Sequence, residues 1–363
     1  MRLPKYRKIF NSLHSDILEG KFDKNGTLPS EEFLCRKWDV SRPTVARALR
    51  ELQMQGLIDR RAGSGTYLRA EKRPVQTTLG LLAEGLGKTE ILDPICAEIT
   101  RAAQQRGCGV FTGGLPPGKS AESIASEWFA NGVRGVFFAP IEHPSSNRQT
   151  LNREIVTAFK NAEIAVVLID RDTLEFPQKS DFDLVAIDNF HAGYELGRHL
   201  SETGSERVAL IAKPDYPSTT DLRLNGLQEG LRYGGVASLD FHVGDPENAD
   251  FMKTLYRPQP IYDTFVCSND QTAARFMQSA FALGFRVPTD FKLAGFDDIS
   301  LASLLPVPLT TIHQPCRSIG ICCVDAMIGR LRHPELPPRS ILLRGTLVVR
   351  QSTGTLSGIH STG

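Results

Sequence analysis

The chain has 363 residues, a hydrophobic fraction of 41% and a formal net charge of +1, values that fit a soluble globular protein with two or three domains. No apolar run approaches the roughly 20 residues of a membrane span, and the basic N-terminus leads into an amphipathic segment instead of a signal-peptide core. Seven cysteines without paired spacing argue against a disulfide framework. We therefore expect a cytoplasmic protein with reduced thiols and no membrane partner.

The near-neutral net charge is the sum of two unlike parts. Residues 1–74 hold 16 Lys and Arg against 9 Asp and Glu, whereas the remaining residues hold 26 against 32. A small basic segment on an acidic body predicts that only the N-terminal part binds a polyanion.

Two helices are predicted in the first 40 residues. The first has an apolar stripe and should end near Gly20; the stripe consists of Tyr6, Ile9, Leu13 and Ile17. The second should begin after Ser30, an N-cap residue followed by Glu31 and Glu32 in the first turn, where acids are favourable. Its expected core face consists of Phe33, Leu34 and Trp38.

The most informative stretch is residues 41–52, S-R-P-T-V-A-R-A-L-R-E-L. Ser41 stands where an N-cap belongs, and Pro43 falls in the first turn, where it costs no hydrogen bond. The apolar stripe of this predicted helix consists of Val45, Ala48, Leu49 and Leu52. The opposite face carries donors suited to phosphates and guanine edges, namely Arg42, Thr44, Arg47 and Arg50. Taken alone, the stretch also fits an ordinary amphipathic helix with a solvated basic face.

The neighbouring residues favour the DNA-binding interpretation. The tight turn at residues 39–41 joins the second and third helices into a helix-turn-helix, which places the third helix to enter a major groove. Two short β-type runs, residues 57–61 and 66–68, flank the glycine turn at 62–65 and predict a hairpin, or wing.

Residues 3–69 resemble the winged-helix domain of the GntR regulator family, through L-P-S-E-x-x-L, V-S-R-x-T-V-x-x-A-L-x-x-L, G-L-I and G-x-G-T-Y-L. In that family the second arginine of S-R-x-T-V-x-R contacts guanines, while the first arginine, the threonine and the wing backbone hold phosphates. The resemblance implies that Arg47 reads bases and that Arg42, Thr44 and Gly65 lie on the DNA backbone. Lys5 is a further phosphate candidate, from its charge and its place before the first helix. The chain departs from the family at three positions, with Glu32 after L-P-S-E and the small Ala62 and Ser64 at the wing tip.

Residues 71–77 are charged, contain a proline and lack apolar periodicity, which predicts a linker between domains. Beyond it, short apolar runs alternate with helical patterns. The runs are 79–83, 109–112, 135–139, 165–170, 184–188, 208–212, 264–268 and 292–296, and the helical patterns are 93–106, 121–131, 151–161, 190–203, 220–233 and 271–284. This alternation predicts parallel sheets covered on both faces and divided between two α/β lobes.

Polar side chains follow several of these predicted strands, at the edge where such sheets bind ligands. They are Asp170 and Arg171, Asp188 and Asn189, Ser268 to Asp270, and Asp297 and Asp298, with Arg223 at the start of a helix. Carboxylates, amides and a guanidinium can form paired hydrogen bonds to adjacent hydroxyls of a polyhydroxyl ligand. Acids after strands also cap helices, and we prefer that role for Asp188, Asp270 and Asp298.

The same stretches resemble a LacI-type effector domain, with the periplasmic-binding-protein-like fold of two lobes and three crossovers. The resemblance rests on V-A-I-D-N-F-H-A-G-Y-E-L-G, R-L-N-G-L-Q-E-G-L, F-V-C-S-N-D-Q-T-A, L-A-G-F-D-D-I, P-L-T-T-I-H-Q-P and L-V-V-R-Q-S-T-G. It implies that Arg223, Asn269 and Asp297 hold a sugar and that Arg171 often joins them. Where the family commonly has N-P-F-F, this chain has T-E-I-L after Lys88, so Lys88 and Glu90 are weaker, more polar effector candidates.

Enzyme motifs are absent from the sequence. Gly87-Lys88-Thr89 lacks the earlier glycine of a phosphate-binding loop, and neither G-x-S-x-G, H-E-x-x-H nor a paired Cys/His site occurs. We therefore expect no catalytic residues, no metal and no cofactor.

Together these features predict an α/β protein with an N-terminal winged helix-turn-helix and a two-lobed, type I periplasmic-binding-protein-like domain, similar in arrangement to arabinose-repressor-type regulators. The expected domains are 1–70 for DNA binding, 71–77 as linker, 78–354 for effector binding and 355–363 as a flexible tail. The expected function is a homodimeric, nucleoid-associated repressor that leaves a pseudo-palindromic double-stranded operator when a small carbohydrate binds. A sugar receptor without a DNA role, and an activator responding to a sugar or sugar phosphate, are the alternatives.

Overall fold

The computed structural model describes residues 5–18, 27–54, 58–61, 65–68, 77–84, 87, 90–116, 118–141, 148–214, 216–236, 238–256 and 259–354. The expectations for Ala62, Ser64, Lys88, the linker residues 71–76 and the tail 355–363 lie outside these residues. The chain divides into two compact units, Met1–Gln76 and Thr77–Gly363. Each unit is described by itself.

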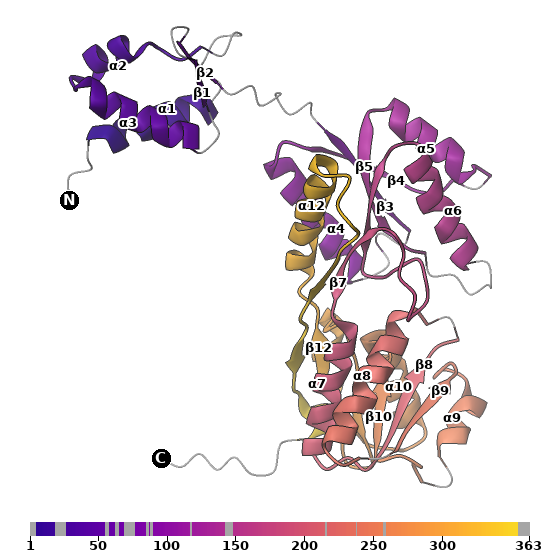
Figure 1. The fold of residues 1–363 in the computed structure, drawn as a ribbon. Coiled ribbons are helices and arrows are strands. Elements are labelled where there is room, and N and C mark those ends of the chain that lie inside the picture. Colours follow the sequence, from indigo (N-terminus) through magenta and orange to yellow (C-terminus); the bar gives the residue numbers. More distant parts are fainter. Residues whose placement is uncertain are drawn as a thin grey trace, which may run out of the picture. The chain divides into compact units, whose positions relative to one another are not determined.

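The described residues of the N-terminal unit form three helices and a hairpin (Figure 1). The helices are α1 (Lys5–Leu18), α2 (Glu31–Trp38) and α3 (Arg42–Met54), and the antiparallel strands are β1 (Ile58–Arg61) and β2 (Gly65–Leu68). The predicted apolar stripe of α3 is confirmed, since its four side chains are fully buried: Val45, Ala48, Leu49 and Leu52. A bridge between Thr27 and Tyr67 ties the segment before α2 to the wing.

The predicted cap of α2 is also confirmed, because the Ser30 hydroxyl accepts a hydrogen bond from the backbone N–H of Phe33 at 3.2 Å. The prediction that Phe33 belongs to the core face was wrong, since Phe33 is 52% exposed whereas Leu34 is buried. Successive helical residues point about 100° apart, and in α2 the core lies on the side of Leu34 and not on that of Phe33.

The C-terminal unit has two α/β lobes. Lobe 1 is built on a six-stranded parallel sheet in the order β13-β7-β6-β5-β3-β4. Its strands are β3 (Thr78–Ala83), β4 (Gly109–Gly113), β5 (Val133–Ala139), β6 (Ala165–Ile169), β7 (Asp183–Ile187) and β13 (Ser340–Leu343). Helices α4 (Leu92–Gln105) and α12 (Cys316–Arg332) cover one face, and α5 (Ala121–Ala130) and α6 (Arg148–Asn161) cover the other (Figure 1).

Lobe 2 is built on a four-stranded parallel sheet in the order β11-β10-β8-β9. Its strands are β8 (Arg207–Ala212), β9 (Ser238–Val243), β10 (Thr264–Cys267) and β11 (Lys292–Ala294). Its helices are α7 (Asn189–Glu202), α8 (Thr219–Tyr233), α9 (Ala249–Leu255), α10 (Asp270–Ala282) and α11 (Ser300–Leu304). A short antiparallel pair, β12 (Thr311–His313) and β14 (Thr346–Val348), and the 3-10 turn Gln351–Thr353 complete it.

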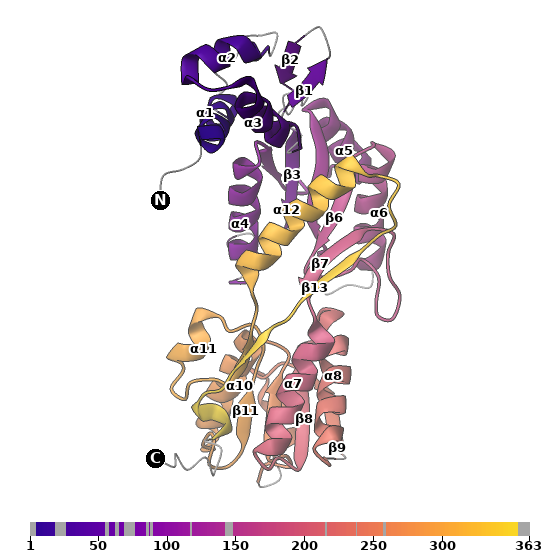
Figure 2. The ribbon, with the colours of Figure 1, turned by 60° about the vertical axis from the view of Figure 1, so that its left-hand side comes forward.

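The chain passes between the lobes three times, after β7, after β12 and after β13 (Figure 2). The two-lobed α/β fold with three crossovers is therefore confirmed. The strand and helix patterns were confirmed with small shifts of their ends, but the short elements β9, β12, β13, β14, α9 and α11, and the long helix α12, were not predicted.

Helices α7 and α8 pack backbone against backbone through glycines spaced four residues apart. A Cβ atom on Gly193 would collide with the carbonyl oxygen of Arg223, and one on Gly226 would collide with that of Phe190. Gly197 and Gly230 repeat this arrangement one turn later. This close approach fixes α8, and with it Arg223, against the start of α7.

Candidate functional site

A cavity of about 390 Å3, called here the interlobe cavity, lies between the two lobes. The structure brings Arg171, Arg223, Asn269 and Asp297 together in its walls, although they come from four separate segments of the chain. The remaining described lining residues are Glu84, Glu90, Ile91, Leu92, Pro140, Ile141, Asp170, Pro217, Thr219, Ser268, Gln271, Ile299 and Gln314. None of these residues is aromatic, so the cavity is bounded mainly by hydrogen-bonding groups and aliphatic carbon.

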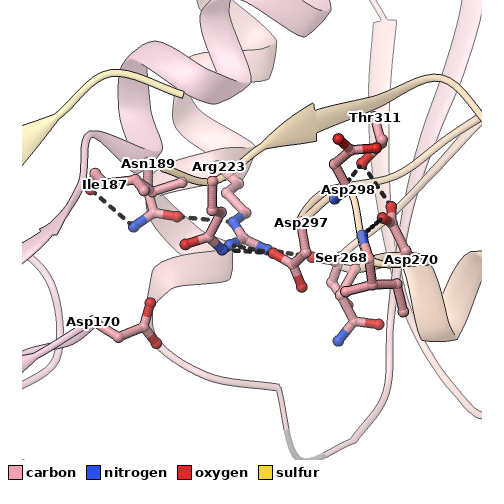
Figure 3. A network of polar contacts seen from close by, with 12 residues as sticks. Asp170, Ile187, Asn189, Arg223, Ser268, Asp270, Asp297, Asp298 and Thr311 are labelled. Carbon is pink, nitrogen blue, oxygen red and sulfur yellow. Dashed lines mark hydrogen bonds and ion pairs between the residues drawn. The ribbon is translucent and has the colours of Figure 1, made fainter. Parts of the chain in front are cut away.

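Arg223 is the central residue of the polar network in this cavity (Figure 3). It is only 5% exposed, and its guanidinium makes three hydrogen bonds. It donates to Asn189 Oδ1 at 2.9 Å, to the carbonyl oxygen of Ser268 at 2.6 Å and to Asp297 Oδ1 at 3.2 Å. The ring of Phe296 lies 4.8 Å from the guanidinium carbon. These contacts hold the guanidinium in one plane and one position, as bidentate recognition requires.

Asp297 and Gln314 extend the network. Asp297 has a φ of 113°, a left-handed backbone conformation that aims its carboxylate toward Arg223. The same Oδ1 atom accepts from Gln314 Nε2 at 2.7 Å. Gln314 is 3% exposed, and its Oε1 atom is buried without a hydrogen-bond partner in the described part of the chain. A buried acceptor of this kind needs a donor, which a ligand hydroxyl can supply.

Asp170 and Arg171 form the wall of the cavity on lobe 1, directly after β6. Their side chains are ion-paired at 2.7 Å and are 10% and 12% exposed. Burial raises the pKa of Asp170 to about 6, while the charge of Arg223 acts in the opposite direction. Burial likewise lowers the pKa of Arg171 to about 10. Burial therefore disfavours the charged forms of both side chains. A ligand that hydrogen-bonds to them would take the place of the water from which burial separates them.

At the start of α10 the structure corrects the prediction that Asp270 caps the helix. Asn269 is the N-cap, and its Oδ1 atom accepts from the backbone N–H of Thr272 at 2.8 Å. Asn269 therefore has its amide NH2 group to offer to a ligand. Asp270 is fully buried and accepts hydrogen bonds from Thr311 Oγ1 at 2.7 Å and from the backbone N–H of Ile299 at 3.1 Å (Figure 3). It joins Ile299, at the start of α11, to Thr311 in β12 instead of capping α10.

Asp270 should make stability depend on pH. Burial and the Asp297 carboxylate raise its pKa from 3.8 to about 8. At pH values between these two pKa values, Asp270 is deprotonated in the unfolded state but keeps its proton in the folded state. The free energy of unfolding should therefore fall as pH rises. Asparagine does not titrate, so Asp270→Asn should not lose stability in this way. We expect the free energy of unfolding of the variant, relative to that of the wild type, to rise by on the order of 4 kcal/mol between about pH 4 and pH 8. Denaturant unfolding at several pH values measures the difference.

The matched control is Asp250→Asn, since Asp250 is an acid in the first turn of α9 with an 89% exposed side chain. Its pH profile should run parallel to that of the wild type. Parallel profiles for Asp270→Asn as well would contradict the raised pKa.

The capping role predicted for Asp188 is confirmed, since its carboxylate accepts from the backbone N–H of His191 at 2.9 Å at the start of α7. The same prediction for Asp298 was wrong. Asp298 has a φ of 53°, which turns its carboxylate back toward the crossover strands, where it pairs with Arg350 at 2.6 Å and with His313 at 3.0 Å. The N-cap position before α11 is Ile299.

Glu90 was expected to contact the effector, and the structure gives its carboxylate a further partner. Glu90 lines the interlobe cavity from lobe 1 and accepts a hydrogen bond from the backbone N–H of Ser300, the first residue of α11 in lobe 2, at 2.8 Å. This hydrogen bond joins the two lobes directly at the cavity. It favours the arrangement of the lobes seen in this structure.

Removing this bridge should loosen the two lobes. We expect Glu90→Ala to raise the hydrogen-exchange rate of the Ser300 amide about fivefold, equivalent to about 1 kcal/mol for a solvent-accessible bond to a charged acceptor. The control is Glu84→Ala, which removes the same charge from the same cavity but keeps the Ser300 bond. Equal exchange in the wild type and in Glu90→Ala would show that the bridge does not hold the lobes.

In the N-terminal unit, the basic face of α3 points into solvent. Arg42, Arg47 and Arg50 are exposed. The guanidinium carbon of Arg47 lies 4.0 Å from the centre of the Tyr6 ring on α1, a cation–π contact that limits its conformations. Arg47 is therefore both accessible and partly ordered before any partner binds.

The other expected DNA contacts surround this face. Lys5 donates from Nζ to the carbonyl oxygen of Asp39 at 3.0 Å, which places its ammonium beside the turn between α2 and α3. Arg42 is 3.8 Å from Glu31 with its side chain 78% exposed, and Thr44 shares a hydrogen bond with Ser41 at 3.0 Å. Gly65 opens β2 with a φ of 122°, a backbone conformation that favours glycine.

Two further findings concern the described residues alone. No three His, Cys, Asp or Glu side chains among them gather in a way that could hold a metal ion. None of the helices in the described ranges is long and apolar enough to cross a membrane.

Comparison with known proteins adds to this geometry. Residues 5–68 match the model of bacterial regulatory proteins of the gntR family, and residues 198–353 match a periplasmic binding protein-like domain. The chain is 26% identical to an arabinose metabolism transcriptional repressor of Geobacillus stearothermophilus over 366 residues, covering 97% of this chain and 98% of that protein.

Two solved structures have a similar fold. A complex of the transcriptional regulator CelR with cellobiose has a TM-score of 0.64 and 20% identity, covering 90% of this chain and all of that one. The lac repressor dimer bound to operator and the anti-inducer ONPF has a TM-score of 0.61 and 21% identity, covering 78% of this chain and 96% of that one. The two-lobed fold is therefore one that ligand-binding regulators share.

Proposed function

The chain joins a GntR-family DNA-binding domain to a periplasmic-binding-protein-like domain, and on that premise we propose that it is a sequence-specific transcriptional repressor released from its operator by a small neutral carbohydrate. The observation that carries the effector half of the proposal is the fixed network of Arg223, Asp297 and Gln314 in the interlobe cavity. We assign DNA binding to residues 1–70, effector binding to 78–354, and linker and tail roles to 71–77 and 355–363.

The polar groups of the cavity favour a polyhydroxyl ligand. Arg223, Asn269 and Asp297 present donors and acceptors side by side, and the buried Gln314 Oε1 accepts from a hydroxyl. Adjacent hydroxyls of a sugar can satisfy such pairs at once, and a missing hydroxyl leaves a buried group unpaired at a cost of about 1–3 kcal/mol.

The charges favour a neutral sugar over a sugar phosphate. Both arginines of the cavity are already paired with carboxylates, Arg171 with Asp170 and Arg223 with Asp297. Glu84 and Glu90 add two further acids to the lining. A phosphate would therefore meet more negative than positive charge. The relatives support a sugar, since one is named as an arabinose metabolism repressor and another holds cellobiose.

For DNA, we propose that α3 enters the major groove with Arg47 on guanine edges. Arg42, Thr44, Lys5 and the backbone at Gly65 would then hold phosphates, which fixes the register of the helix on the duplex. Lys5, Arg42, Arg47 and Gly65 are exposed, and Lys5 and Thr44 lie by the turn that leads into α3, which supports this arrangement.

We further propose that the protein is a cytoplasmic, nucleoid-associated homodimer on a pseudo-palindromic operator, as suits a regulator of this kind. The lac repressor structure of similar fold is a dimer bound to operator. Sugar binding would close the lobes and change their angle at the dimer interface, and with it the spacing of the DNA-binding domains. The relatives are regulators, and we propose no enzymatic activity, no metal and no cofactor.

Two other functions remain as alternatives. A sugar receptor without a DNA role would bind no duplex, and an activator would bind its operator more tightly with sugar. A thermal-shift screen of the full chain with L-arabinose, D-ribose, D-xylose, cellobiose and arabinose 5-phosphate tests the effector class. A neutral sugar at a hundred times its Kd should stabilise the chain by about 2.7 kcal/mol. Stabilisation by the phosphate alone would contradict the neutral-sugar proposal.

A further inference from the structure

A second cavity, of about 220 Å3, lies beside the crossover from β7 to α7 and is called here the crossover cavity. It shares Asp170, Arg171 and Thr219 with the interlobe cavity, so these three residues form a common wall. The polar network described above thus borders this second space as well.

The lining of the crossover cavity is mainly apolar and includes large side chains that reach solvent. Phe176 is 50% exposed, Phe190 43% and Leu342 49%, although the three come from a loop, a helix and a strand. Ala186 and Ile187 on β7 form its buried base. Exposed apolar side chains scattered singly need no explanation, but three that converge on one concave site indicate binding.

Two acids at this cavity are already hydrogen-bonded within the chain, while Gln178, Lys179, Ser218 and Ser340 add polar groups to its rim. The Asp172 carboxylate accepts from the backbone N–H groups of Leu174 and Ser180, and the Asp188 carboxylate caps α7. Most of the surface that the cavity offers a ligand is nevertheless apolar, in contrast to the hydrogen-bonding interlobe cavity.

The crossover cavity also spans the two lobes. Phe176 and Leu342 belong to lobe 1, in the loop after β6 and on the edge strand β13, whereas Phe190 and Leu222 belong to lobe 2, on α7 and α8. A ligand bound here would contact both lobes. It would therefore favour the relative arrangement of the lobes that forms this cavity.

We propose that the crossover cavity is a second binding site, separate from the sugar site, for a small uncharged molecule with a single aromatic or aliphatic ring. Its volume of about 220 Å3 is below the roughly 300–1,000 Å3 of sites for drug-sized ligands, so the cavity fits a molecule with one ring. The proposal includes that the sugar binds this same arrangement of the lobes, with Glu90 bridging them, so the ring ligand should strengthen sugar binding. By reciprocity the sugar strengthens binding of the ring ligand by the same factor.

The test uses the full chain with 4-fluorophenol as the probe, followed by fluorine NMR. We expect saturable binding to the wild type and about tenfold weaker binding to Leu342→Lys and to Phe190→Lys, since both exposed positions accept a charge without loss of the fold. The matched control is Leu283→Lys, at the end of α10 with 46% exposure, which should bind like the wild type.

Three results would overturn the proposal. Unchanged binding in both lysine variants would place the probe elsewhere. Loss of binding in Asn269→Asp with retention in Leu342→Lys would place it in the interlobe cavity. A change of oligomeric state in Leu342→Lys, measured by sedimentation, would make the apolar residues a contact between copies of the chain.

Discussion

Replacing Arg223 by methionine is expected to weaken effector binding at least a hundredfold while DNA binding by the N-terminal unit persists. The change removes donors from three buried acceptors, including the Asp297 carboxylate. Breaking a buried ion pair from one side costs about 3–5 kcal/mol in the free energy of unfolding, so the variant should also melt earlier. Loss of the charged donors should weaken sugar affinity by a factor of a hundred or more, equivalent to about 3 kcal/mol. Calorimetric titration with the sugar found by the thermal-shift screen measures this.

Two further variants separate binding from stability. Arg232→Met alters an arginine on the same helix that is 75% exposed and pairs only at the surface with Glu229, so sugar affinity should not change. Asn269→Asp keeps the oxygen that caps α10 but replaces the amide donor by an acceptor. It should fold normally and lose about 1–3 kcal/mol of sugar affinity. Wild-type sugar affinity in Asn269→Asp and in Arg223→Met would remove both residues from the effector site.

Arg47→Ala is expected to weaken binding to the specific operator by about 1–3 kcal/mol and to leave binding to random duplexes nearly unchanged. The reason is that a base contact contributes only where the right base is present. The side chain is exposed and rests on the Tyr6 ring, so its removal should not disturb the core. Fluorescence anisotropy with duplexes selected from a random pool by the full chain gives both affinities.

Arg42→Ala is the comparison for this experiment, because Arg42 is another exposed arginine of α3 but is assigned to a phosphate. It should weaken specific and random duplexes equally and reduce the salt dependence of binding by about one counterion. An equal loss on both kinds of duplex for Arg47→Ala would contradict its role in base recognition.

The parts of the fold that were predicted depend on local patterns. The stripe of Val45 and Leu49 on α3 and the Ser30 cap of α2 need only neighbouring residues, so they could be read from the sequence. Apart from the edge strands β9 and β13, the parallel strands of both lobes were equally visible, because strands buried on both faces form continuous apolar runs. Arg171, Asn269 and Asp297 could be placed near a ligand because ligands of such sheets bind at the carboxyl ends of strands. Their choice as sugar contacts, together with Arg223, rested on the resemblance to LacI-type effector domains.

The missed elements depend on distant partners. Helix α12 has buried residues such as Ile319, Cys323 and Met327 on one side of a helix whose other side is also largely apolar, so no clear stripe marks it. Strands β12, β13 and β14 have only three or four residues, and their partners are set by tertiary structure. Gln314 was missed for this reason, since it follows a strand too short to recognise.

The sequence did not show which of two neighbours, Asn269 or Asp270, caps α10. Both residues can cap a helix, and the sequence places them side by side. The tertiary packing of β12 against β11 brings the Thr311 hydroxyl and the Ile299 N–H to the Asp270 carboxylate, and both donate to it. Asn269 is therefore the residue that caps α10. The hydrogen-bond partner of Glu90 likewise depends on tertiary structure, because Ser300 lies 210 positions away in the chain.

In the proposed function, sugar binding in the C-terminal unit and DNA binding by the N-terminal unit oppose each other. The most direct measurement is the affinity of the full chain for a selected operator duplex, with and without the sugar that stabilises it. We predict that saturating sugar weakens DNA binding by about tenfold or more, within the usual coupling of about 1–3 kcal/mol, and that DNA weakens sugar binding by the same factor. An operator affinity that stays the same, or rises, when the sugar site is saturated would contradict it.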